Sequence, residues 1–292
     1  MITFATFWHG SPLSAFEQAC LCSVVRRGYS VTVYSYHNLG TLPGELKAGD
    51  ASEIAPQDMV QRFIYDGRPN LSHFSDFFRY NLFDRTSHIW IDADMLMLRP
   101  LDFEVATEII AMESPTSICG AIMRLNPGEK LDLILNKIDK AKDRDLIWGE
   151  TGPRLLTEIF GEQSIRKVAH PPNDFFPISH NDFWRVFLPS ERDWCESRCK
   201  ESFSVHLWNN IVDRLGIWKR IAPPAGSWLA ARYEADGTAG MFDASYPPEV
   251  MRRMIDNWIL RKSGDDLGIK SVARQFVPSL RRSARSYIDR LR

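Results

Sequence analysis

Several features that mark common functional classes are scarce in this chain of 292 residues. The net charge is −1 at pH 7, so overall positive charge cannot attract nucleic acid, and no nucleic-acid partner is expected. Cysteines number 5, an odd count, which argues against a secreted disulfide framework and for free thiols. Cys195 and Cys199 have no second Cys/His pair at the spacing of a zinc site.

Long hydrophobic runs and targeting signals are also missing. No stretch of about 18 apolar residues occurs, so no transmembrane helix is predicted. The N-terminus MITFATFWHG lacks the basic region that begins a signal peptide. Residues 10–17, GSPLSAFE, lack the basic residue of a Gly-rich phosphate loop, which disfavours a nucleotidyltransferase. These absences together predict a cytoplasmic protein.

The chain does contain enough apolar material for a full core. Hydrophobic residues make up 44% of it and charged residues 25%, the proportions of an ordinary globular protein. The apolar run 2–8 predicts a buried strand, and YSVTVYSY at 29–36 predicts a second. Between them, Ser11 or Ser14 can cap a helix that ends near Arg27. Strand, helix and strand in this order predict a βαβ unit and a parallel sheet.

A further helix and strand lead to a pair of acidic residues. Phe74, Phe77 and Phe78 give residues 72–83 the apolar side of an amphipathic helix, and residues 88–91 predict the next strand. That strand delivers Asp92 and Asp94 to its carboxyl end, the edge at which open α/β sheets bind ligands. Further along we predict a strand at 117–123, helices at 128–141 and 153–160, loops at 41–70, and loops with short edge strands at 168–188.

The two carboxylates in HIWIDADMLMLRP (88–100) need a chemical partner. Burying an ionised carboxylate without one is costly. Residues two apart in a strand point the same way, so Asp92 and Asp94 can converge on one point. A hard divalent cation that also binds diphosphate oxygens supplies the missing charge. The simpler alternative is that both residues cap the turn after the strand.

The surrounding motifs are similar to those of a known family. The stretch HFSDFFRYNLFDRTSHIWIDADMLMLRPL (73–101) resembles the DXD sugar-transferring enzymes of glycosyltransferase family 32. Weaker matches follow in order at 7–36, at GETGPRLLT (149–157), at FFPI (175–178) and at VHLWNN (205–210), so the resemblance covers about residues 1–215. Unlike the family, this chain lacks two glycines before the DXD strand and carries Trp90 where Tyr is usual. The shared residues of the central block are Ser75-Asp76, Arg79-Tyr80, Asp92-Ala93-Asp94 and Pro100-Leu101.

The resemblance implies both a fold and a chemistry. The fold is GT-A, a Rossmann-like α/β architecture with a mostly parallel central sheet that holds a nucleotide-sugar. The chemistry is hexosyl transfer with retention at the anomeric carbon. Asp92 and Asp94 are then metal ligands and His206 is the third, for Mn²⁺ or Mg²⁺, of which Mn²⁺ suits an imidazole nitrogen better. Without the resemblance, a lone histidine is more simply a structural residue.

The resemblance also assigns the remaining site residues. Asp76 and Arg79, three apart on one helix face, contact the donor sugar, whereas an ordinary surface ion pair there is worth little. Trp8 lies beside the nucleobase or, alternatively, only in the core. Glu150 and Thr151 can touch the acceptor, and no catalytic base is assigned because the departing phosphate can take the acceptor's proton. The catalytic set is Asp76, Arg79, Asp92 and Asp94, and the donor-binding set is Trp8, Gly10, Asp76, Arg79, Tyr80, Asp92, Ala93, Gly152 and Pro153.

The C-terminal part of the chain differs from the rest in charge. Residues 251–292 contain 11 Lys/Arg and 4 Asp/Glu, a balance of +7 that leaves −8 on the first 250 residues. We therefore divide the chain into a GT-A domain at 1–245 and a basic, amphipathic helical extension at 246–292. Residues 250–292 can make peripheral contact with an anionic membrane, on the inner face of the plasma membrane, or can pack on the acidic body.

These observations lead to one functional prediction and one rival. The prediction is a metal-dependent retaining glycosyltransferase that moves a hexose from a UDP- or GDP-linked donor to a saccharide or glycolipid acceptor. Its expected setting is the synthesis of bacterial surface polysaccharide or lipopolysaccharide. The rival is a catalytically silent protein that binds nucleotide-sugars or glycans on the same fold.

Overall fold

The predicted N-terminal βαβ unit is present in the structure. The computed structural model describes residues 2–10, 12–103, 108–161 and 168–263. β1 (Thr3–Phe7), α1 (Ala15–Arg26) and β2 (Ser30–Ser35) follow one another, and β1 pairs with β2 in parallel. Helix α1 begins after Ser14, whose backbone N–H donates to the Glu17 carboxylate at 3.0 Å, one half of a capping box.

A six-stranded, mostly parallel sheet forms the centre of the molecule. Its strand order is β3-β2-β1-β6-β9-β8, and only the β6–β9 and β8–β9 pairs are antiparallel. After β1, the chain adds β2 and then β3 on one side of β1, and later places β6 on the other side of β1. The carboxyl ends of β1 and β6 therefore flank the point where the strand order reverses, at which open α/β sheets bind ligands. The predicted α/β class with a mostly parallel central sheet is confirmed. The remaining strands of this sheet are β3 (Leu46–Asp50), β6 (Ile89–Ile91), β8 (Ile109–Ser114) and β9 (Ser117–Arg124).

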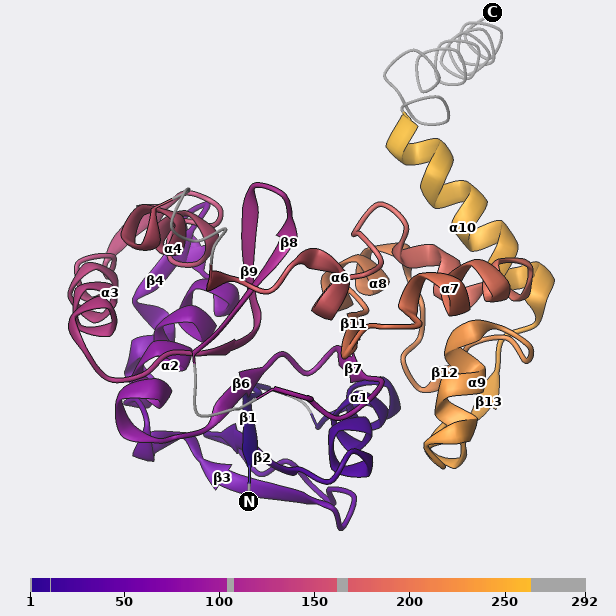
Figure 1. The fold of residues 1–292 in the computed structure, drawn as a ribbon, viewed down its shortest axis with the longest axis horizontal. Helices are drawn as coiled ribbons and strands as arrows, with labels where there is room; N and C mark the ends of the chain where they lie inside the picture. The colour runs from indigo at the N-terminus through magenta and orange to yellow at the C-terminus, as the bar shows by residue number, and fades with distance from the viewer. Residues whose placement is uncertain (1, 11, 104–107, 162–167, 264–292) are drawn as a thin grey trace, which may run out of the picture.

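Helices cover the sheet on both faces (Figure 1). Phe74 and Phe78 of α2 pack with Trp90 of β6 in one core cluster, to which α3 and α4 also contribute. Leu21 and Val24 of α1 pack on the opposite face of the sheet. The apolar side that the sequence assigned to α2 is thus the side that contacts the sheet. The bounds on the α2 side are α2 (Leu71–Arg85), α3 (Glu129–Asp139) and α4 (Pro153–Phe160).

Three small sheets flank the central one. β7 (Met95–Met97) pairs antiparallel with β11 (Ser204–His206), which draws the C-terminal half toward the DXD turn. β10 (Arg144–Leu146) pairs in parallel with β4 (Phe63–Tyr65), and β4 pairs with β5 (Arg68–Pro69). The third sheet pairs β12 (Ile221–Ala222) with β13 (Ala244–Ser245).

Two stretches differ from their prediction as loops. Residues 41–70 contain β3, β4 and β5 with the 3₁₀ helices η1 (Ala51–Glu53) and η2 (Gln57–Gln61). β3 reads LKAGD and lies at the sheet edge with exposed residues, so it has no apolar alternation to reveal it. Strand β8 was not predicted. In 168–188, the described residues form α6 (Pro172–Phe175) and η3 (Phe183–Phe187) rather than edge strands.

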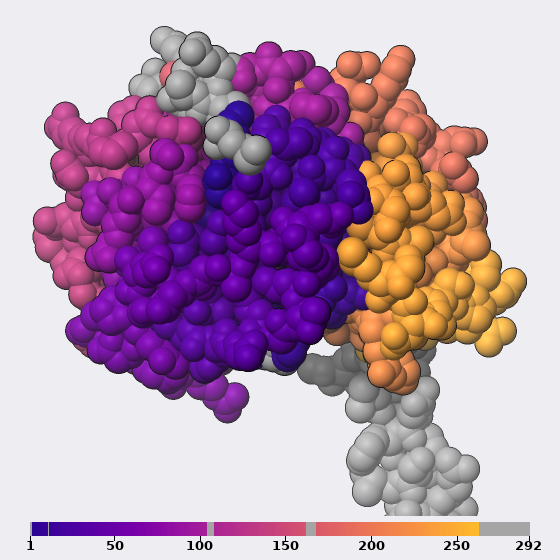
Figure 2. All heavy atoms as spheres, turned by 90° about the horizontal axis from the view of Figure 1, so that it is seen from below, coloured from indigo at the N-terminus to yellow at the C-terminus, as the bar shows by residue number. Residues whose placement is uncertain are grey.

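The described part of the C-terminal extension packs on the body. Helix α10 (Pro248–Ser263) buries Met251 and Ile255 in a core cluster shared with α7, α8 and α9, whereas Ile259 stays 40% exposed. Figure 2 shows the orange-to-yellow C-terminal part of the described chain beside the indigo N-terminal half. Among the described residues, no helix combines the length and hydropathy needed to cross a membrane. The rest of the predicted extension, 264–292, lies outside the described residues. The other elements here are η4 (Pro189–Glu191), α7 (Arg192–Cys199), α8 (Asn209–Leu215), α9 (Trp228–Ala235) and η5 (Ala239–Met241).

Candidate active site

The acidic pair lies in the turn between β6 and β7. The backbone N–H of Asp92 donates to the carbonyl of Ala121 in β9 at 2.7 Å. The backbone N–H of Met95 donates to the Asp92 carbonyl at 3.1 Å. Both residues thus stand at the carboxyl end of β6, beside the reversal of strand order. The antiparallel register of β7 and β11 sets His206 opposite Met95, one residue after Asp94. Strand pairing therefore brings the third predicted ligand to the pair from more than a hundred residues away.

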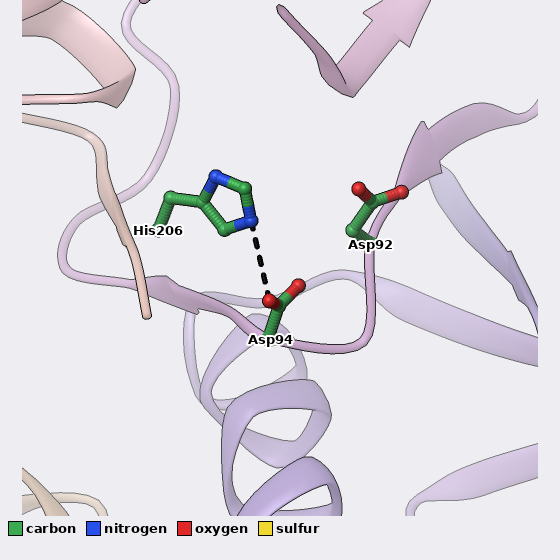
Figure 3. Close-up of side chains that lie close together, drawn as sticks. All are labelled: Asp92, Asp94 and His206. Atoms are coloured by element: carbon green, nitrogen blue, oxygen red, sulfur yellow. Dashed lines mark ion pairs between the residues drawn. The ribbon is translucent and has the colours of Figure 1, made fainter. Parts of the chain in front are cut away.

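Asp92, Asp94 and His206 form one cluster (Figure 3). One oxygen or nitrogen of each side chain lies within 4.8 Å of those of the other two. His206 Nε2 is 3.2 Å from Asp94 Oδ2, and the backbone N–H of Asn209 donates to the same oxygen at 2.6 Å. Asp94 and His206 are buried, whereas the Asp92 side chain keeps 30% of its surface exposed. The site is thus nearly enclosed, with Asp92 at its open side.

The charges of the cluster fit a cation. Burial raises the pKa of Asp92 despite the opposing charge of Arg79, and the nearby Asp94 carboxylate adds to the rise. Burial acts in the same direction on Asp94, but the charge of His206 and three hydrogen bonds outweigh it and lower the pKa of that carboxyl. Two carboxylates and an imidazole close together are a suitable donor set for Mn²⁺ or a similar divalent ion.

Arg79 and Trp90 hold Asp92 from the protein side. Arg79 Nη2 donates to Asp92 Oδ1 at 3.1 Å, and the indole N–H of Trp90 donates to the same oxygen at 2.6 Å. The Arg79 guanidinium also lies over the Trp90 ring, 4.7 Å from its centroid. Trp90, the residue in which this chain departs from the family, is therefore a hydrogen-bond donor to the acidic pair.

The glycine at 120 gives Arg79 its place. A Cβ added to Gly120 of β9 would stand 1.8 Å from Arg79 Nη1, which no side-chain contact allows. The buried guanidinium therefore occupies the space where any other residue would have its side chain. Sequence reasoning missed Gly120, because a glycine within a strand pattern signals a close approach only after its neighbour across the fold is known.

Asp76 is held by a loop that follows β10. Arg79 Nη1 lies 3.3 Å from Asp76 Oδ1, and the Thr151 hydroxyl donates to Asp76 Oδ2 at 2.8 Å. A Cβ on Gly152 would meet the same oxygen at 3.0 Å, so the loop backbone comes close to the carboxylate. His73 Nδ1 is 2.6 Å from the Thr151 hydroxyl oxygen. The structure thus joins Asp76, Arg79 and Asp92 in one line of ionic contacts.

The other residues predicted to bind the donor lie in the core, in turns or at the start of a helix. Tyr80 is fully buried, and its hydroxyl donates to the Thr151 carbonyl at 3.0 Å, so it supports the loop from beneath. Trp8 is partly buried against the core cluster on the α1 face, at the end of β1. Gly10 follows at φ +98°, the left-handed region that a glycine adopts without strain. Ala93 is buried within the DXD turn, and Pro153 is the first residue of α4.

Other residues of the site were not assigned a role from the sequence, although Asn209 lies in the matched segment 205–210. Asn209 binds Asp94 through its backbone and donates from its side chain to the buried carboxylate of Glu17 at 3.0 Å. Lys219 Nζ lies 3.0 Å from the same carboxylate. His73 was likewise unassigned. These residues come from segments far apart in the chain, so only the fold reveals that they share a network.

Comparison with known proteins finds a family model that is similar to part of the chain. Residues 142–220, which include the Thr151 loop and His206, match the model described as the alpha 1,4-glycosyltransferase conserved region. The chain carries an alpha 1,4-glycosyltransferase region. The predicted resemblance to glycosyltransferases of family 32 type is confirmed over these residues.

The similar curated proteins are all lactosylceramide 4-alpha-galactosyltransferases. The proteins of Pongo pygmaeus and Homo sapiens are each 25% identical over 146 residues, and that of Mus musculus is 28% identical over 147 residues. Each match covers 46% of this chain, and it covers 66%, 41% and 40% of the three relatives in that order. The match thus spans less than two thirds of each relative's length.

One solved structure is similar in part. The PaToxG glycosyltransferase shares 10% sequence identity, with a TM-score of 0.40 over 57% of this chain and 69% of that chain. No conclusion rests on a likeness of this degree.

Proposed function

We propose that this chain is a metal-dependent, retaining glycosyltransferase that transfers a hexose from a UDP- or GDP-linked sugar to a glycan or glycolipid. The observation that carries the proposal is the cluster of Asp92, Asp94 and His206 at the reversal of strand order, in contact with Arg79 and so with Asp76. An ordinary pair of turn-capping carboxylates has no need of a buried imidazole and guanidinium beside it.

The cluster is suited to a divalent ion. Asp92, Asp94 and His206 are the residues that would hold it, and the imidazole nitrogen favours Mn²⁺ over Mg²⁺. When bound, such an ion offsets the negative charge of the departing diphosphate. The protein's own part is to fix the ligands in advance: Trp90 and Arg79 orient Asp92, and the Asn209 backbone orients Asp94.

Asp76 and Arg79 are suited to the donor sugar. Asp76 accepts hydrogen bonds from Thr151 and lies beside Arg79, and its remaining acceptor positions can bind sugar hydroxyls. Arg79 cannot swing away, since Gly120 and Trp90 enclose its guanidinium. Gly152 lets the loop backbone come close to the same carboxylate. We therefore assign donor binding to these residues, with Tyr80 and Pro153 as supports of the loop.

The names of the relatives suggest a more specific reaction. They are called lactosylceramide 4-alpha-galactosyltransferases, so galactose is the first hexose to test and a lactose-ended glycolipid the first acceptor. The nucleoside is assigned to the side of β1 where Trp8 and Gly10 follow the strand. Assembly of a bacterial surface polysaccharide or lipopolysaccharide in the cytoplasm is the setting that the sequence motifs favour.

A donor screen tests the proposal directly. A panel of UDP- and GDP-sugars is incubated with the full chain, with Mn²⁺ or with chelator, and released nucleotide is measured. We expect one donor to be hydrolysed in the presence of Mn²⁺, and Asp94→Asn to lower the rate at least about a hundredfold. Asp84→Asn, which changes an exposed carboxylate of α2, is the matched control. A metal-independent rate, or an unaffected Asp94→Asn, contradicts the metal assignment. Binding of a donor without turnover supports the catalytically silent protein instead.

Peripheral membrane contact is a separate part of the proposal. Residues 250–292 carry the excess of basic charge, and within α10 the side chains of Val250, Ile259 and Leu260 are 42%, 40% and 43% exposed. Both features suit an anionic bilayer surface. In flotation with anionic vesicles, the full chain should float with the vesicles, whereas a chain that ends at Ser263 should not. The shorter chain still contains the buried Met251 and Ile255. Equal flotation of both chains contradicts a role for 264–292.

A further inference from the structure

An exposed aromatic side chain stands at the edge of the candidate active site. Trp148 and its neighbour Ile147 are each 54% exposed, although large apolar residues are usually covered. They belong to the loop between β10 and α4, three and four residues before Thr151, which binds Asp76. Their position is therefore tied to the donor-binding carboxylate through a few residues of one loop.

This loop is fixed by its own hydrogen bonds. The Glu150 carboxylate accepts the backbone N–H of Ile147 at 3.0 Å and pairs with Arg144 of β10. Glu150 N–H donates to the Ile147 carbonyl at 3.1 Å, which closes the turn. Trp148 is thus presented to solvent by a rigid turn and not by a long, free loop.

Two further rings lie against Trp148. β10 pairs in parallel with β4 so that Leu146 faces Tyr65, and the loop after β10 therefore starts beside the end of β4. The Tyr65 and Trp148 rings are 5.8 Å apart in an edge-to-face arrangement, and the His73 ring is 6.2 Å from Trp148. The three rings form a small aromatic wall, which we name the Trp148 wall.

His73 adds an unused hydrogen-bonding group to this wall. The Thr151 hydroxyl gives its proton to Asp76, so toward His73 it can only accept, and His73 Nδ1 is the protonated nitrogen. Nε2 is then a bare acceptor. Nε2 is buried and has no hydrogen-bond partner among the described residues, and the whole His73 side chain is buried, with 2% exposed. An acceptor of this kind calls for a hydroxyl or N–H donor.

We infer that the Trp148 wall is the subsite for the acceptor saccharide, with a pyranose ring stacked on Trp148 and a sugar hydroxyl directed to His73. A pyranose has an apolar C–H face that packs on an aromatic ring, and it carries hydroxyl donors at its rim. The inference rests on the proposed glycosyl transfer, because the wall lies beside Asp76, on the donor-sugar side of the site. A nucleobase is the other flat ligand that can stack on Trp148.

Saturation-transfer NMR on the full chain without nucleotide tests the subsite. The probes are methyl glycosides of galactose, glucose, mannose and N-acetylglucosamine, methyl β-lactoside and, separately, UDP and GDP. The variants are Trp148→Ala, Trp148→Phe, which keeps a flat ring, and Trp218→Ala, a control for a Trp that is 64% exposed elsewhere. We expect at least one saccharide to bind, Trp148→Ala to weaken it about tenfold or more, and Trp148→Phe to restore most of the loss.

The outcomes separate the subsite from the reaction. The inference is overturned if no saccharide binds the native chain, if Trp148→Ala binds as well as native, or if Trp218→Ala loses the same signal. It is also overturned if Trp148→Ala weakens the nucleotides and not the saccharides, which assigns the wall to the base. Saccharide binding that depends on Trp148 in a chain that turns over no donor leaves the subsite standing and refutes the proposed transfer.

Discussion

At the scale of single residues, Trp90 shows how an unusual side chain becomes necessary through one hydrogen bond. Its ring is packed in the core under α2, and its N–H reaches Asp92 at 2.6 Å while Arg79 covers its face. A phenylalanine can fill much of the same volume, but its ring has no donor for the carboxylate. Trp90 therefore links the core to the candidate metal site.

Trp90→Phe is expected to weaken the site more than the fold. A hydrogen bond to a charged group is worth about 1.5–3 kcal/mol, so Mn²⁺-dependent donor binding should weaken about tenfold or more. Isothermal titration with Mn²⁺ and donor measures the change. Trp184→Phe removes an indole N–H that binds only the Asn181 carbonyl and should bind donor as the native chain does. Equal donor affinity in the two variants counts against a role for the Trp90 hydrogen bond.

His73 gives the chain a pH-dependent stability. Burial lowers the pKa of His73 below its ordinary value of 6.5, with the charge of Glu150 opposing. At a pH between the pKa of His73 in the unfolded chain and its lower pKa in the folded chain, the unfolded chain binds a proton that the folded chain does not. The stability of the fold therefore falls as the pH drops below about 6.5. His73→Asn, which keeps a donor for Thr151, should flatten this fall. Urea unfolding at pH 7.5 and 5.5 measures it, and an unchanged pH dependence in the variant contradicts the assignment.

At the scale of elements, the contact between β9 and α2 depends on the missing side chain of Gly120. Gly120→Ala places a methyl group where Arg79 Nη1 now lies, so the guanidinium must leave Asp92 and Asp76. We expect donor hydrolysis to fall at least about tenfold and the free energy of unfolding to drop by about 1–3 kcal/mol. Gly44→Ala, with no atom within 4 Å of the added Cβ, is the control for both measurements. A fully active Gly120→Ala contradicts the placement of Arg79.

Prediction of the elements succeeded where the local pattern was strong. Helix α4 begins and ends at the predicted residues, because Pro153 marks its first turn and Leu155, Leu156 and Phe160 define one buried side. It failed at β3, whose residues LKAGD carry no strand pattern. That strand forms because β2 offers it backbone partners along its whole length, which is a property of the sheet and not of the segment.

At the scale of the whole molecule, α10 anchors the C-terminal part through two side chains. Ile255 is fully buried with α8 and α9, whereas Ile259, one turn later, is 40% exposed. Ile255→Ala should lower the free energy of unfolding by about 2–4 kcal/mol, and Ile259→Ala by less than about 0.5 kcal/mol. Chemical denaturation of the two variants compares them directly. Equal losses contradict the packing of α10 on the body.

Local residue patterns were enough to predict the chemistry available to this protein and the start of its fold. Asp92 and Asp94 after an apolar strand and the first βαβ unit are local patterns, so residue periodicity and spacing revealed them. Asp76 and Arg79 received their role through the family resemblance. His206 was assigned only through the family resemblance. The resemblance to glycosyltransferases rests on these residues and the motifs around them.

How these residues come together depends on contacts between distant parts of the fold. His206 reaches Asp94 because β7 and β11 pair in one register, Arg79 has its place because Gly120 lies across the sheet, and the Trp148 wall forms because β10 pairs with β4. Each of these contacts joins segments distant in the chain. Its geometry depends on strand register and close packing, which no local pattern of residues encodes.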